Sequence, residues 1–208
     1  MSKYLGLLIT LSLFISCSEN RESDNPEIVL AENVPTYNTA DMVFVTKRGH
    51  VEFTSRVFGT IGTFTGESRD LNGKIDLLEN TISFSLELSS LKTGIRQRDR
   101  DMHRTLDVDR YPVSEYTGVL SSVIDQNSPV MQNVNVEGAF TLHGVTRDLI
   151  ITGTLRNQPD GLILEVDWPL KLSDFQIEQP RIYGVGIEDE QDIRIRATLV
   201  PELIASGL

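Results

Sequence analysis

Cysteine and histidine, the side chains that most often bind transition metals, are scarce in this sequence. Its 208 residues contain one cysteine, Cys17, and three histidines, His50, His103 and His143. A single cysteine excludes an intramolecular disulfide. The histidines lack the His-x-His or His-x-x-x-His spacing of metal sites, and the chain has neither a glycine-rich phosphate loop nor a Gly-x-Ser-x-Gly elbow. We therefore expect no metal, no cofactor and no enzymatic activity.

Positive charge is also in short supply. The 19 lysines and arginines stand against 30 aspartates and glutamates, for a net charge of −11. Removing residues 1–16 takes away only Lys3, so the remaining chain carries −11 − 1 = −12. Such a field opposes direct binding to nucleic acid or to an anionic membrane surface. The content of 39% hydrophobic and 24% charged residues predicts one folded globular domain.

The N-terminus carries an apolar run that is too short to span a membrane as a mature helix. Lys3 precedes this run, which occupies residues 5–15 and ends just before Cys17. That order is typical of an export signal. The tetrapeptide Phe-Ile-Ser-Cys that ends at Cys17 resembles a bacterial lipobox, which implies that residues 1–16 are removed and that Cys17 is acylated. The alternative is an ordinary signal peptide with a cysteine at this place by chance.

The next segment, residues 17–40, begins with the acylated cysteine and reads as a flexible tether. It is polar, acidic and interrupted by Pro26 and Pro35. Ser18 directly after the cysteine is compatible with sorting to the outer membrane of a Gram-negative bacterium, whereas the acidic residues that follow leave export to the cell surface open. We expect an exported protein held in the periplasm by its acyl chains. A folded body at residues 41–200 and a tail at 201–208 complete the predicted organisation.

One predicted hairpin, residues 134–156, organises the rest of the chain. Apolar and polar residues alternate on both arms with the period of two of half-buried antiparallel strands. The apolar set is Val134, Val136, Phe140, Leu142, Leu149, Ile151 and Leu155. His143-Gly144 separates the arms, where glycine can adopt the positive φ of a tight turn. Gly138 and Gly153 interrupt the apolar faces, which predicts bulges or bends.

Further strand patterns follow at short spacing, and a two-residue connection at Glu79-Asn80 predicts a second hairpin. The expected strands are residues 42–47, 51–58, a stretch ending at 66, 74–78, 81–91, 114–124, 134–142, 147–156, 162–170 and 192–199. Residues 94–109 are highly charged and predict a short helix. We expect an all-β fold, an extended antiparallel barrel of eight or slightly more strands with one helical excursion, because closure removes exposed strand edges.

The interior phase of these strands is apolar. It contains Phe53, Val57, Phe84, Leu86, Phe140, Leu142, Leu164, Val166 and Trp168. Small barrels are either filled by such side chains or hold one small ligand, and periodicity leaves both arrangements open. A ligand bound by these side chains is expected to be apolar and elongated.

A few ionisable residues are candidates for a catalytic or metal site. Asp99, Asp101 and His103 would form a hydrolytic or metal site only if they converged in a cleft. The arginines and aspartates around His103 favour an ion-pair network, and the position of His143 favours a structural turn. The acidic residues at 188–192 lack EF-hand spacing and are more typical of a solvated turn than of a calcium site.

Four motifs, in this order and spacing, resemble the YceI-like, lipocalin-like polyisoprenoid-binding domain. They are SLKTGIRQRD at residues 90–99, DRYP at 109–112, FTLHGVT at 140–146 and LSDF at 172–175. The resemblance covers roughly residues 40–200. At two positions the chain departs from the pattern, because Asp101 stands where the family usually has histidine and Gln176 replaces a glycine.

The resemblance implies an exported barrel that encloses the tail of a polyisoprenoid, an isoprenoid quinone or a similar amphipathic lipid. Members are usually treated as carriers or sequestering proteins rather than enzymes, and some form dimers, so a homodimer is compatible with it. Our leading hypothesis is therefore a lipid-binding lipoprotein that reaches the membrane through Cys17. Two alternatives remain open here: a scaffold lipoprotein with a filled barrel that docks a protein partner, and a hydrolase or metal protein that uses Asp99, Asp101 and His103.

Overall fold

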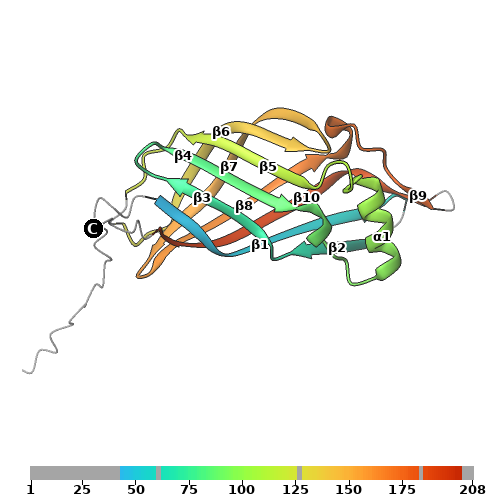
Figure 1. Cartoon of the computed structure of the whole chain (residues 1–208), viewed down its shortest axis with the longest axis horizontal. Coiled ribbons are helices and arrows are strands. Elements are labelled where there is room, and N and C mark those ends of the chain that lie inside the picture. The colour runs from blue at the N-terminus through green and yellow to red at the C-terminus, as the bar shows by residue number, and fades with distance from the viewer. Residues whose placement is uncertain (1–42, 60–61, 126–127, 183–184, 203–208) are drawn as a thin grey trace, which may run out of the picture. The chain divides into compact units, whose positions relative to one another are not determined.

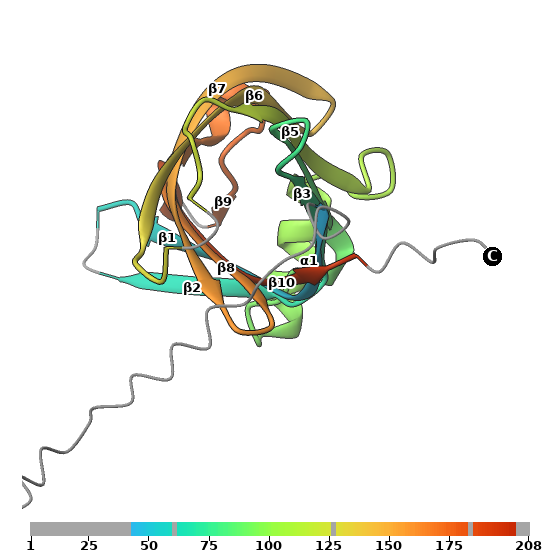
Figure 2. The same ribbon diagram turned by 90° about the vertical axis from the view of Figure 1, so that its left-hand side faces the viewer.

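The computed structural model describes residues 43–59, 62–125, 128–182 and 185–202. Within them, eight antiparallel strands close into the predicted barrel, which Figure 2 shows end-on. Around the ring they are β1 (Val43–Val57), β3 (Leu71–Asp76), β4 (Thr81–Glu87), β5 (Val113–Leu120), β6 (Gln132–Leu142), β7 (Val145–Gln158), β8 (Gly161–Lys171) and β10 (Val185–Pro201). β10 pairs with β1 and completes the ring.

Two shorter strands extend this ring. β2 (Thr63–Ser68) and β3 lie one after the other along the same side of β1, paired with residues 51–56 and 43–45 respectively. β9 (Arg181–Ile182) pairs with the start of β10. The prediction of two separate strands at 42–47 and 51–58 is wrong, because the residues between them pair with β10 and continue β1. The register shifts between Thr46 and Arg48 and between Ser55 and Val57 mark the irregular points of this long strand.

The central hairpin of β6 and β7 is confirmed. Val134, Val136 and Phe140 point inward and are buried, and the turn residues His143 and Gly144 both have positive φ, of 52° and 74°. This pair of dihedrals matches the twist of the two strands. Pairing runs without a register shift from Gln132 opposite Leu155 to Leu142 opposite Val145.

Of the bulges or bends predicted at Gly138 and Gly153, the bulges are absent, because the strands pair there without a register shift; the bends stay a prediction. A Cβ atom at Gly138 would lie 2.2 Å from the Thr117 carbonyl oxygen, and one at Gly153 would lie 2.7 Å from the Glu165 carbonyl oxygen. These glycines are needed because the neighbouring strand passes too close for a side chain.

The helical excursion is confirmed as α1 (Arg96–Thr105), which lies at the same end of the barrel as β9 (Figure 1). β4 is shorter than predicted because a 3-10 turn, Leu88–Ser90, follows it. A second 3-10 turn, Leu172–Phe175, follows β8. The last strand starts at Val185, so the acidic residues 188–192 lie within β10 and do not form the predicted solvated turn. No helix in the described ranges is long and apolar enough to cross a membrane.

The two ends of the barrel differ in how they are filled. One end, called here the closed end, carries the β3–β4 and β7–β8 turns and is packed by Phe44, Leu155, Leu162 and Leu199, each no more than 1% exposed. The other, called here the open end, carries α1 and the β6–β7 turn. The candidate functional site lies in the part of the barrel between its middle and the open end.

Candidate functional site

A cavity of about 540 Å³ occupies this part of the barrel. Side chains from β1, β4, β6, β8, β10 and α1 line it, and its wall is overwhelmingly apolar. The residues packed at the closed end are not among those that line it, so the cavity is a blind pocket. At the open end the wall includes Ile95, which is 50% exposed, so the cavity reaches solvent there.

Strand alternation explains why the wall is apolar. On β4, Ile82, Phe84 and Leu86 are buried and line the cavity, while the intervening Ser83 and Ser85 are only partly buried. Val134 and Leu142, eight residues apart on β6, both line the wall. At ~3.3 Å per residue and a strand tilt of ~40°, this stretch makes the cavity roughly 20 Å deep.

All the side chains predicted to face a ligand lie on this wall. They are Phe53, Val57, Phe84, Leu86, Phe140, Leu142, Leu164, Val166 and Trp168. The sequence left a filled and a hollow interior open, and the structure has the hollow one. That these side chains contact a lipid stays a prediction.

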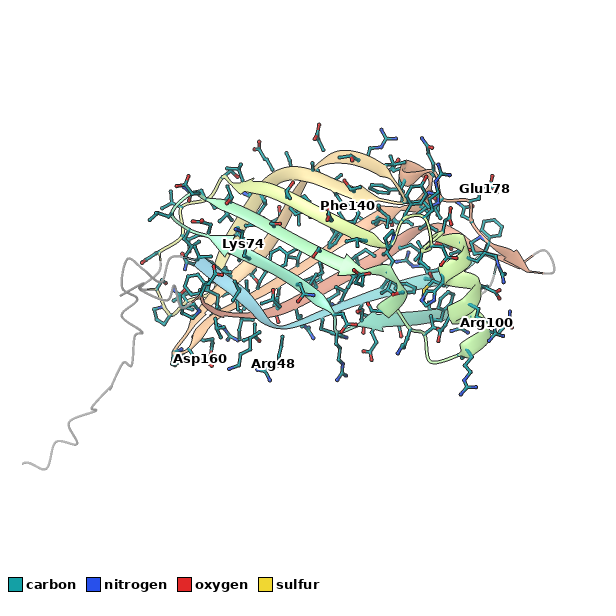
Figure 3. All side chains as sticks on the ribbon, in the orientation of Figure 1. Arg48, Lys74, Arg100, Phe140, Asp160 and Glu178 are labelled. Carbon is teal, nitrogen blue, oxygen red and sulfur yellow. The ribbon has the colours of Figure 1, made fainter. Side chains whose placement is uncertain are left out.

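Aromatic rings shape the part of the wall near the open end. Phe140, labelled in Figure 3, meets the edges of Trp168 and Phe175 at centroid distances of 6.1 and 5.3 Å. Phe53 meets Phe64 of β2 edge-on at 6.3 Å. Edge-to-face packing holds such rings in defined orientations. The aromatic part of the wall is therefore an apolar surface whose rings have fixed orientations.

The buried polar groups of the wall bond to the protein itself. The Ser55 hydroxyl donates to the Gln191 side-chain oxygen, and the Gln191 amide donates to the carbonyl oxygens of Glu188 and Glu190. The Tyr116 hydroxyl donates to the Val136 carbonyl oxygen at 3.0 Å. Burial raises the pKa of Tyr116 to about 12, with a further contribution from the negative charge of Glu137. A ligand thus meets few unused polar atoms inside the barrel.

Helix α1 contributes a part of the wall that sequence reasoning missed. Met102 and Leu106, four residues apart on one face, pack against the core, and Gln97, Arg98 and Asp101 line the cavity beside them. The spacing of Met102 and Leu106 was the available signal, since residues four apart share a helix face. This spacing was overlooked because most of the other residues of the segment are charged.

The three candidate residues of a hydrolytic site have separate structural partners. Asp99 accepts hydrogen bonds from the Thr93 backbone N–H and hydroxyl, and these bonds lower the pKa of its carboxyl group. His103 contacts the Leu91 carbonyl oxygen at 2.9 Å. Asp101 pairs with Arg104 at 3.0 Å. Asp99 and His103 thus fasten α1 to the segment before it, and among the described residues His103 forms no ion pair of the kind predicted for it.

The other polar candidates also hold the framework together. The His143 ring contacts the Phe175 carbonyl oxygen at 3.2 Å, in keeping with the predicted structural turn. Within β10, Asp189 accepts from the Ser173 hydroxyl and backbone N–H, and these bonds lower the pKa of its carboxyl group. In the described part of the chain, no three histidine, cysteine, aspartate or glutamate residues are grouped so that they could hold a metal ion. Cys17 and the rest of residues 1–42 lie outside the described residues.

Residues 43–199 match the YceI-like domain family. The chain belongs to this family. Among solved structures, it is similar to a polyisoprenoid binding domain from Saccharophagus degradans implicated in plant cell wall breakdown, with a TM-score of 0.65 and 16% identity over 77% of this chain and 99% of that one. No similar sequence was found among curated proteins.

Two further solved structures have the same fold. BcnA of Burkholderia cenocepacia has a TM-score of 0.59 and 15% identity, covering 74% of this chain and 96% of that one. A YceI protein of Campylobacter jejuni has a TM-score of 0.54 and 17% identity, covering 69% and 87%. The identities are low, so these likenesses concern the barrel rather than the residues in it.

Proposed function

We propose that this protein binds one long apolar lipid, a polyisoprenoid or a similar amphipathic chain, with its tail in the barrel. The observation that carries the proposal is the blind cavity of about 540 Å³ with its apolar wall. Its volume lies within the ~300–1,000 Å³ of single-ligand pockets. Membership of the YceI-like family and the fold shared with a polyisoprenoid binding domain support the same class of ligand.

The wall binds the apolar tail of the ligand and makes few directional contacts that would require a particular arrangement of polar groups in the ligand. Apolar burial contributes about 25 cal/mol per Å² and is not directional. The polar groups of Ser55, Gln191 and Tyr116 already bond within the protein. Because the closed end is packed, the lipid enters tail first through the open end and leaves its polar head near α1.

The protein then acts as a carrier or sequestering protein rather than an enzyme. We propose that acylation of Cys17 anchors it in the periplasm, at the outer membrane of a Gram-negative bacterium, with residues 18–40 as the tether. The alternative of a scaffold with a filled barrel loses its premise, because the cavity is present. A homodimer is compatible with this role, as is binding of an isoprenoid quinone.

Native mass spectrometry of the protein produced by a periplasmic route tests the ligand. A stoichiometric adduct whose extract is a long isoprenoid is the expected result. A bare protein mass, with no uptake of an added isoprenoid quinone or prenol, would overturn the proposal.

Metabolic labelling with a radioactive fatty acid tests the anchor. The protein should incorporate label and sediment with membranes, whereas Cys17→Ser should do neither. Labelling that persists in Cys17→Ser would place the acyl group elsewhere and contradict the lipobox interpretation.

A further inference from the structure

Of the residues that the structure describes, one cation lines the cavity and forms no ion pair with a carboxylate. Arg98 of α1 lines the wall at the open end, and its guanidinium carbon lies 4.3 Å from the ring centroid of Phe64 on β2. Among the described residues, no ion pair or hydrogen bond of its side chain accompanies this stacking contact. The carboxylate of the next residue, Asp99, accepts its hydrogen bonds from Thr93, which lower the pKa of the carboxyl group, and the charge of Arg98 lies close enough to help lower it.

The other charged groups on the wall are accounted for. Asp101 accepts hydrogen bonds from Arg104 and from the Gln97 side chain. Glu115 lies in the exposed phase of β5, between two buried residues whose side chains point inward. Arg98 therefore supplies the cationic group at the mouth of an otherwise apolar pocket.

The Phe64 ring holds the guanidinium in place without using its N–H groups. Cation–π stacking stabilises the charge and orients the planar fork, while its five N–H donors remain in the plane of the group. That fork fits the paired oxygens of a carboxylate or phosphate, and such charge-assisted hydrogen bonds are among the strongest in proteins. A neutral headgroup would use only a fraction of this capacity.

We propose that Arg98 is the headgroup site of the barrel and selects a lipid that ends in an anionic group, a phosphate or a carboxylate. This inference rests on the proposed function, since the tail of that lipid occupies the cavity. The head then lies at the open end, against α1, where water completes its solvation. A lipid alcohol or quinone with the same tail binds more weakly.

Two probes with the same prenyl chain and different heads test the proposal: geranylgeranyl monophosphate and geranylgeraniol. The protein is the full chain with Cys17→Ser, which removes the proposed anchor. The single tryptophan, Trp168, lines the cavity, so its fluorescence reports binding of either probe. We expect the phosphate to bind about tenfold more tightly or better, with a preference that shrinks as salt is added.

Arg98→Gln should reduce the affinity for the phosphate to that for the alcohol, and Arg98→Lys should keep part of the preference. Arg96→Gln is the matched control, because Arg96 lies on the same helix, is exposed and does not line the cavity. It should leave the preference intact.

The outcomes separate the two proposals. Equal affinities of the unaltered Arg98 protein for both probes, or a preference that survives Arg98→Gln, would overturn the headgroup site and leave lipid binding standing. If Arg96→Gln lost the preference for the phosphate as fully as Arg98→Gln, the preference would come from the overall positive charge of α1, and this result would also overturn the headgroup site. Failure to bind either probe would instead count against the proposed function itself.

Discussion

Leu162 and Leu164 lie two residues apart on the same inward face of β8, yet they have different surroundings. Leu162 is 1% exposed and belongs to the packed closed end, whereas Leu164 is 6% exposed and lines the cavity. The boundary between the solid and the hollow part of the barrel thus passes between them. The same substitution at the two positions should have different effects.

Leu162→Ala should lower the free energy of unfolding by about 3–5 kcal/mol, because it opens a void in a packed region. Leu164→Ala should lower it by only about 2 kcal/mol, since the removed atoms already face an empty space. Urea unfolding of the lipid-free protein measures both. Equal losses would show that the cavity is collapsed in solution.

Phe140→Asp should abolish lipid uptake, because it places a charge on the wall beside Trp168 where the chain would lie. Ile150→Asp is the matched control, since Ile150 lies on the outer face of the same hairpin and is 71% exposed. Trp168 fluorescence with added prenol measures uptake. If Phe140→Asp does not fold, Val166→Phe offers a milder change that fills the cavity with apolar atoms and should also reduce uptake. Normal uptake by a folded variant would contradict the placement of the ligand.

Tyr116 should make the protein sensitive to alkaline pH. Its pKa is about 12 in the folded protein against 10.0 for the free side chain, so the unfolded state loses the proton first as the pH rises. The corresponding stability is fully present below pH 10 and is lost as the pH rises toward 12, by about 1–2 kcal/mol.

Tyr116→Phe should be less stable than the parent protein by about 1 kcal/mol at pH 8, because the hydrogen bond to the Val136 carbonyl oxygen is lost. The difference should shrink and then reverse toward pH 12. Urea midpoints of both proteins across this range provide the measurement, and parallel curves would show that Tyr116 titrates normally.

Gln176→Gly should stabilise the protein. Gln176 ends the turn after β8 with φ 56° and ψ 30°, a left-handed conformation that is costly for a residue with a Cβ atom. Glycine removes this strain at some cost in chain entropy, for a net gain of about 1 kcal/mol and a rise in Tm of about 2–4 °C. Thermal unfolding measures the gain, and a decrease in Tm would show that the Gln176 side chain makes a stabilising contact in solution.

The hairpin of β6 and β7 shows how much of this barrel was accessible from sequence. Alternation is a property of single strands, so it identified the inward residues, and the turn residues His143 and Gly144 set the register locally. Residues 48–50 of β1 were misread as a break because their pairing with β10 depends on residues far away in the chain. The reason for glycine at positions 138 and 153 was not accessible either, since the backbone atoms that exclude a side chain there belong to other strands.

The sequence by itself determined an apolar interior, an antiparallel barrel and a short helix within residues 94–109, because periodicity, turn chemistry and local charge act over a few neighbouring residues. Only the tertiary structure decided that the barrel is packed at Leu162 and hollow at Leu164, and that Arg98 lies over Phe64 at the open end. Whether side chains fill the interior depends on the combined register of eight strands around the ring, and strand periodicity carries no information about the width that results.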